Sequence, residues 1–185
     1  STYQRQLSTL YQNSRGSFFD DVTRRTGAGI STYAQVKWGV GFVDFDNDGH
    51  RDLFNACGHL IDNVQHFDDT TSFEARNILP RNNGQGQFVN VSDQSGDGML
   101  VKLSSRGAAF DDLDNDGDID CVILNTRREP TLLRNDSPRN HHWLQIGLKG
   151  TRTNRDGIGA RVTVKAGDKS QIDEVHSGRS YQSDF

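Results

Sequence analysis

Residues 107–120 read GAAFDDLDNDGDID, and residues 39–52 read GVGFVDFDNDGHRD. Counted from Asp44 or from Asp112, each stretch has Asp at positions 1, 3, 5 and 9 and Gly at position 6. Short runs of apolar residues, several of them aromatic or β-branched, stand on both sides of each acidic segment, as is typical of strands bounded by turns. The pattern predicts two strand–loop–strand units, with a first loop at Asp44–Asp52 and a second loop at Asp112–Asp120.

Alternating carboxylates on a tightly curled loop are suited to calcium, which takes about six to eight oxygen ligands. Glycine at position 6 allows the sharp turn because it tolerates positive φ. Oxygen-only ligands favour calcium over zinc or copper, and magnesium prefers to keep its waters. We therefore expect two calcium ions. The expected ligands are Asp44, Asp46, Asp48, the backbone carbonyl of His50, and Asp52 in the first loop, and Asp112, Asp114, Asp116, Asp118 and Asp120 in the second.

The alternative interpretation is a pair of solvated acidic turns. It leaves four carboxylates crowded within a few ångströms, where their mutual repulsion would raise their pKa values. A divalent cation removes that repulsion and would stabilise the fold. An EF-hand is disfavoured, because position 12 is Asn55 in one loop and Ile123 in the other, where that motif needs Glu between helices.

A second element repeats along the chain together with the loops. Leu10–Asn13 corresponds to Leu79–Asn82, and a third copy appears at Leu132–Asn135. Asn82 opens a segment, residues 82–86, whose Asn and Gly residues indicate a hairpin turn. The acidic loops and these segments recur at nearly the same spacing along the chain, which predicts a duplicated unit rather than a chance match.

Composition and charge narrow the class of protein. Only 32% of the 185 residues are apolar, with 19 Gly and 3 Pro, which favours many short strands over a helical bundle. The two loops carry a charge of −8 and leave +4 for the rest of the chain, without a basic tract that would suit nucleic acid. No stretch approaches the length and apolarity of a membrane span. Cys57 and Cys121 either pair or remain buried free thiols.

The pattern changes after the third copy. Residues 143–148 alternate between two faces, which predicts a strand, and residues 161–164 and 172–175 flank a turn at 167–169. These runs indicate a second, smaller all-β module. Residues 58–77 are long and polar and give no structural prediction.

The repeated units resemble FG-GAP/VCBS repeats, through Gly107–Phe110 with its following acidic loop and through the hairpin pattern at residues 82–91 and 132–135. The stretch after residue 139 is similar to the ASPIC/UnbV domain, through Trp143-Leu144 and residues 157–162. The resemblance implies an all-β fold, with partial integrin-α-like β-propeller blades at residues 1–138 and an incomplete ASPIC/UnbV module at residues 139–185. Because a closed propeller needs about four to eight blades, and the chain begins with Ser1, we expect a processed protein or part of a longer one.

The resemblance implies a secreted, cell-surface or periplasmic calcium-binding module that binds an extracellular protein or glycan. It implies no reaction, and the sequence contains no GxSxG, HExxH or P-loop motif. Two alternatives stay open: a structural subunit of an extracellular homo-oligomer, filament or layer, favoured by open strand edges, and an accessory domain of a longer enzyme. His141-His142 looks like a metal pair, but neighbours on a strand face opposite sides.

Overall fold

A computed structural model of the chain describes residues 2–138, 140–152 and 154–181. Within these ranges the secondary structure is mostly short β-strands with one short α-helix and several 3-10 turns, so the all-β class is confirmed. The elements in chain order are β1 (Tyr11–Ser14), β2 (Phe18–Asp21), α1 (Thr23–Thr26), η1 (Ile30–Thr32), β3 (Lys37–Val43), β4 (Asp52–Cys57), η2 (Val64–His66), β5 (Pro80–Asn82), β6 (Phe88–Asn90), η3 (Ser92–Gln94), η4 (Asp97–Leu100), β7 (Ser105–Asp111), β8 (Asp120–Asn125), β9 (Arg128–Leu133), β10 (Arg161–Ala166) and β11 (Lys169–Glu174).

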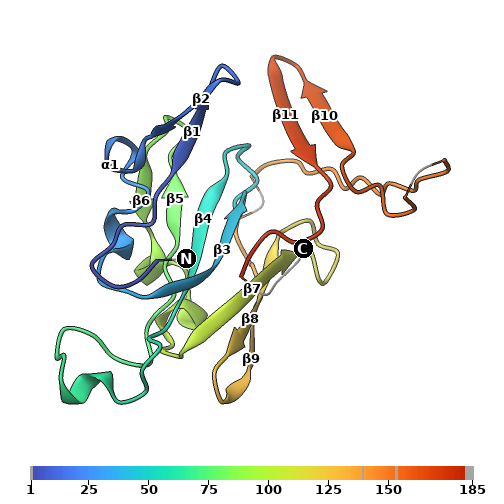
Figure 1. The fold of residues 1–185 in the computed structure, drawn as a ribbon. Helices are drawn as coiled ribbons and strands as arrows, with labels where there is room; N and C mark the ends of the chain where they lie inside the picture. The colour runs from blue at the N-terminus through green and yellow to red at the C-terminus, as the bar shows by residue number, and fades with distance from the viewer. Residues whose placement is uncertain (1, 139, 153, 182–185) are drawn as a thin grey trace.

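The strands form small antiparallel sheets joined by loops (Figure 1). Four are hairpins, made by β1–β2, β3–β4, β5–β6 and β10–β11, and the fifth has the order β7-β8-β9. No closed propeller forms among the described residues. The expected hairpin around residues 82–86 is confirmed, since it connects β5 to β6.

The duplication seen in the sequence is also present in the strand pairing. Val43 pairs with Asp52 between β3 and β4, and Asp111 pairs with Asp120 between β7 and β8. Both pairings contain a register shift near the start of the first strand. Each acidic loop therefore closes a hairpin of the same design.

Two glycines let the duplicated hairpins pack together through β3 and β7. A Cβ atom at Gly39 would lie 2.7 Å from the backbone nitrogen of Ala108, and a Cβ atom at Gly41 would overlap the ring of Phe110. The absence of side chains on this face of β3 brings the two units into contact. The motif GVG in the first unit is thus explained by packing.

An aromatic cluster forms the core beneath both loops. The rings of Phe54 and Phe110 lie 5.4 Å apart, and Phe45 from the first loop contacts both at 6.4 and 5.9 Å. Such tilted and edge-to-face pairs add to the stabilisation from burial. Around them lie the buried side chains of Ala56, Met99, Ala108, Cys121 and Ile123. The two loops therefore share one core.

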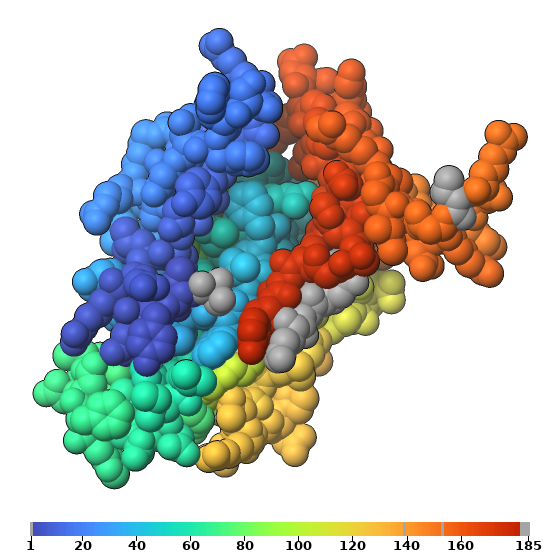
Figure 2. Space-filling model, viewed as in Figure 1, coloured from blue at the N-terminus to red at the C-terminus, as the bar shows by residue number. Residues whose placement is uncertain are grey.

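The C-terminal part contains the expected hairpin β10–β11, but the strand predicted at residues 143–148 is wrong. This segment has no strand partner among the described residues, and Leu144, Ile146 and Leu148 are all more than 40% exposed. Without a neighbouring strand, alternation of apolar residues does not produce a ladder. Figure 2 shows the surface hollowed between the N-terminal strands and this C-terminal hairpin.

Residues 58–77, which had no structural prediction, contain η2 and form isolated β-bridges. Gly58 pairs with Glu74, and Ala75 pairs with Leu103. Among the described residues, none of the helices combines the length and apolarity that crossing a membrane requires.

Candidate metal centre

Each acidic loop is shaped by the carboxylate at its first position. Both oxygens of Asp44 accept backbone N–H groups, from Asp48 at 3.0 Å and from Gly49 at 2.8 Å. In the second loop, Asp112 accepts the N–H groups of residues 116 and 117 at 3.0 and 2.9 Å. These bonds hold each loop in a closed coil, so the duplicated sequence gives a duplicated conformation.

The backbone of the two loops is left-handed at the same two positions. At position 4, Asn47 has a φ of 55° and Asn115 has a φ of 61°. At position 6, Gly49 and Gly117 have φ values of 90° and 92°. Glycine, and to a lesser degree asparagine, are the residues that adopt these angles without strain. The requirement for Gly at position 6, expected from the sequence, is confirmed.

The coil brings three carboxylates of each loop together. Asp44, Asp46 and Asp48 each offer an oxygen, and these oxygens all lie within 4.8 Å of one another. The equivalent residues of the second loop do the same. They are Asp112, Asp114 and Asp116. Both groups have the spacing that would let one cation contact three carboxylates at once.

The environment of these carboxylates fits a cation. Oδ1 of Asp46 is buried and accepts no hydrogen bond from the described residues, although buried carboxylate oxygens are normally paired. Loss of hydration raises the pKa of Asp44. The backbone N–H donors of Gly49 and Asp48 lower it, and the charges of Asp48 and Asp46 raise it. In the second loop, loss of hydration and the neighbouring carboxylates raise the pKa of Asp114. A divalent ion among these oxygens would relieve the repulsion.

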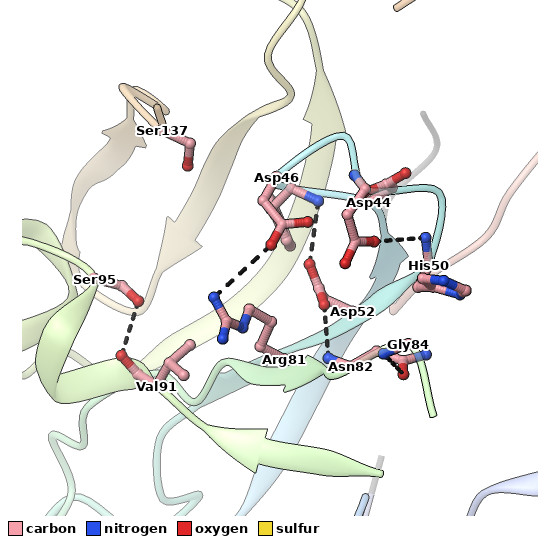
Figure 3. A network of polar contacts seen from close by, with 12 residues as sticks. Asp44, Asp46, His50, Asp52, Arg81, Asn82, Gly84, Val91, Ser95 and Ser137 are labelled. Carbon is pink, nitrogen blue, oxygen red and sulfur yellow. Dashed lines mark hydrogen bonds and ion pairs between the residues drawn. The ribbon is translucent and has the colours of Figure 1, made fainter. Parts of the chain in front are cut away.

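The ninth-position residue of the first loop has a different environment from the three clustered carboxylates. Asp52 is only 1% exposed, and its oxygens accept the backbone N–H groups of Phe45 at 3.2 Å and Asn82 at 2.8 Å (Figure 3). Burial raises its pKa to about 7; the two N–H donors oppose this shift, and the charges of Asp46 and Asp44 add to it. Asp52 thus connects its own loop to the following hairpin β5–β6.

Asp120 repeats this arrangement in the second loop. It is 3% exposed and accepts the backbone N–H groups of Leu113 at 3.1 Å and Asn135 at 2.8 Å. The side-chain amide of Asn135 also donates to the backbone carbonyl of Phe45 in the first loop, at 2.8 Å. The structure therefore places both ninth-position residues under their loops, outside the three-carboxylate groups.

The residues at position 7 differ between the loops. His50 is exposed and its backbone N–H donates to Asp48 at 2.7 Å, while the role expected for its carbonyl stays a prediction. Asp118 is buried, with 3% exposed, and accepts the side-chain amide of Asn47 at 2.9 Å.

Sequence reasoning missed the residues that support the loops. Asn82 and Asn135 anchor the ninth-position carboxylates, and Arg81 lies 3.9 Å from Oδ2 of Asp46 (Figure 3). The signal was present, because the dipeptide Arg-Asn recurs at residues 81–82 and 134–135 at the same place in the repeat.

The C-terminal module contacts both loops. A Cβ atom at Gly117 would overlap the indole of Trp143, so this ring lies directly against the second loop. On the first loop, the ammonium of Lys169 donates to the carbonyl of Asp48 at 3.3 Å, and Arg51 forms an ion pair with Asp173 at 3.0 Å.

The other groups considered from the sequence are two thiols in the core and a pair of exposed histidines. Cys57 and Cys121 are free and buried, so the free-thiol alternative holds in this structure. Burial raises the pKa of Cys57 to about 12 and also raises the pKa of Cys121. His141 and His142 are both exposed.

The comparisons with known proteins bear on the C-terminal part alone. Residues 150–184 match the family model described as ASPIC and UnbV. This supports an ASPIC/UnbV domain at that place and leaves the first 149 residues unassigned. Residues 153 and 182–184, which the match includes, lie outside the described ranges. No curated protein matches the chain.

Proposed function

We propose that the chain is a calcium-binding repeat module with one ion in each acidic loop. The observation that carries the proposal is the duplicated group of three carboxylates, Asp44, Asp46 and Asp48 in one loop and residues 112, 114 and 116 in the other. The unpaired buried oxygen of Asp46 supports it, because a cation would supply the missing partner.

The residues that would hold the ions include those three carboxylates in each loop. The remaining ligands expected from the sequence stay predictions, namely the His50 carbonyl, Asp52, Asp118 and Asp120. Bound calcium would supply charge neutralisation and would link the two strands that flank each loop. Asp52 and Asp120 position the loops by accepting backbone N–H groups from them and from the next structural element. Since the ion binds the folded loop better than the unfolded chain, its binding would add to stability.

The repeat assignment is part of the same proposal. FG-GAP/VCBS-like units in a propeller-type arrangement are supported by the equal registers of β3–β4 and β7–β8. The equivalent bonds from Asp52 to Asn82 and from Asp120 to Asn135 give further support. From the resemblance of the repeats we further propose a secreted, cell-surface or periplasmic protein that binds an extracellular protein or glycan, and we propose no reaction for it.

Calcium titration calorimetry on the intact chain tests the proposal. We expect two sites in the native protein, one site after Asp46→Asn and one after Asp114→Asn. The exposed carboxylate of Asp156 gives a matched control, and Asp156→Asn should retain both sites. Absence of calcium binding by the native protein would refute the proposal.

One observation favours the alternative of a structural subunit. The β1–β2 hairpin exposes Tyr11, Phe18 and Phe19, whose exposed fractions are 60%, 72% and 69%. Phe19 lies on the same face of the hairpin as Tyr11, because it pairs with Asn13, and Phe18 lies on the other face. Exposed aromatic side chains mark interaction surfaces in many proteins. Light scattering of the native protein tests this alternative: an assembly that dissociates after Phe18→Ser and Phe19→Ser would support it, and a monomer at all concentrations would contradict it.

A further inference from the structure

The side chain of Asn47 crosses from the first loop to the second. Its amide nitrogen donates to Oδ1 of Asp118 at 2.9 Å and to the backbone carbonyl of Gly117 at 3.2 Å. These two acceptors occupy positions 6 and 7 of the second loop, directly after Asp116. One residue of the first loop therefore holds the turn of the second.

This contact reaches a carboxylate that the proposed function assigns to the metal. The backbone N–H of Asp118 donates to Oδ1 of Asp116 at 3.0 Å. A chain of hydrogen bonds thus runs from the amide of Asn47 through Asp118 to Asp116. Its middle member is 3% exposed, and hydrogen bonds to a charged group with little access to water are among the stronger ones.

The equivalent residue of the second loop does not return the contact. Asn115 occupies the same loop position as Asn47 with nearly the same φ, 61° against 55°. Among the described residues, the side chain of Asn115 makes no hydrogen bond to the first loop. At this loop position, the support therefore runs from the first loop to the second.

We infer that Asn47 is a positioning residue for the metal site of the second loop, an inference that rests on the proposed calcium binding. By fixing Gly117 and Asp118, Asn47 holds the carboxylate of Asp116 in the geometry that receives the ion. Loss of its amide leaves the acceptors of the second loop free to move before binding. The second site then has to be ordered by the ion itself, and its affinity falls.

The test measures how a substitution in one loop changes the calcium affinity of the other loop. Asp46→Asn leaves a protein whose calcium site is the second loop, and Asp114→Asn leaves one whose site is the first. Asn47→Gly is added to the former and Asn115→Gly to the latter, because Gly keeps the left-handed backbone while removing the amide. Calcium affinity is measured by calorimetry.

We expect Asn47→Gly to weaken calcium binding at the second loop about threefold to tenfold, because it removes two hydrogen bonds and part of their net contribution reaches the ion through Asp116. Asn115→Gly should leave the first loop within about twofold by the same scale. Thermal melts in chelator identify any variant that is unfolded. If Asn47→Gly is unfolded, Asn47→Asp takes its place. Aspartate keeps the size of the side chain but turns a carboxylate toward Asp118, so weaker calcium binding at the second loop is again expected.

Two results would overturn the inference, and they differ from failure of the proposed function. The first is an unchanged second-loop affinity after loss of the Asn47 amide. The second is an equal effect of Asn115→Gly on the first loop, which would show general loosening. If neither parent protein, Asp46→Asn or Asp114→Asn, binds calcium, the proposed calcium sites themselves are wrong.

Discussion

Oδ1 of Asp52 lies 2.8 Å from the backbone nitrogen of Asn82, so the last carboxylate of the first loop binds the first strand of the next hairpin. The same bond at the same distance joins Asp120 to Asn135. Both carboxylates are nearly inaccessible to water, and each also accepts an N–H group from its own loop. The acidic loops are thus part of the framework that connects one repeat to the next.

Replacing Asp52 by Ala should destabilise the protein even when calcium is absent. Two partly buried N–H donors, those of Phe45 and Asn82, would lose their acceptor, and we expect a loss of about 2–3 kcal/mol in the free energy of unfolding. Urea denaturation in chelator measures it, with the exposed residue Asp168 replaced by Ala as the control. A midpoint equal to that of the control would contradict the framework role.

The close approach of β3 and β7 predicts a steric effect at Gly39. Its Cβ would meet backbone atoms of Ala108 and Arg106 at 2.7 and 2.8 Å, which cannot move as a side chain can. Gly39→Ala should lower the free energy of unfolding by about 1–3 kcal/mol or more, the usual effect of overpacking. Gly147, whose added Cβ would meet open space, provides the matched control for the denaturation curves. Equal stability of the two alanine variants would show that the strands can separate without cost.

The buried ammonium of Lys37 predicts a pH dependence far from the acidic loops. It donates to the carbonyls of Tyr3, Gln6 and Thr32, yet loss of hydration lowers its pKa from 10.5 to about 8. Between these pH values the unfolded chain binds the proton and the folded chain releases it. Stability should therefore rise from about pH 8 to pH 10.5, by at most about 1.4 kcal/mol per pH unit.

Denaturation curves in this pH range, compared between the native protein and Lys37→Met, measure the effect of Lys37. The variant removes the titrating group and keeps an apolar stem, so the difference in stability between the two proteins should change with pH. A constant difference would mean that Lys37 titrates normally in the folded state.

The local parts of the structure could be predicted from the sequence. The strands on both sides of Asp44–Asp52 and Asp112–Asp120 follow from short apolar runs bounded by turn residues, and the turn at residue 49 follows from glycine. The groups of three carboxylates follow as well, because positions 1, 3 and 5 lie within one coil. These features depend on residues close together in the chain.

The remaining features depend on contacts between distant residues. The burial of Asp52 requires Asn82, which lies 30 residues away, and the amide of Asn47 reaches acceptors 70 and 71 residues away. Residues 143–148 alternate as a strand does, but alternation cannot supply the partner that a ladder needs. Sequence periodicity contains no information on which loop faces which.

The two thiols should be unreactive in the native protein. Cys57 and Cys121 are buried and unpaired, and burial raises the pKa of each, which suppresses the reactive thiolate. A thiol reagent at neutral pH should label neither residue in the folded protein and both in denaturant. Labelling of neither residue in denaturant without reductant would reveal a disulfide and contradict the structure.

Trp143 should report calcium binding at the second loop, since its indole lies against Gly117. In a Trp38→Phe background, where Trp143 is the remaining tryptophan, calcium should shift the emission to shorter wavelength, because an ordered loop would shield the half-exposed ring from water. Asp114→Asn should abolish the shift, and Asp46→Asn should preserve it, because the first loop contacts Lys169 and Asp173 of the C-terminal module instead. The opposite dependence, with loss in Asp46→Asn and retention in Asp114→Asn, would mean that the C-terminal module senses the first loop. In that case the contact between Trp143 and Gly117 would have no part in calcium binding.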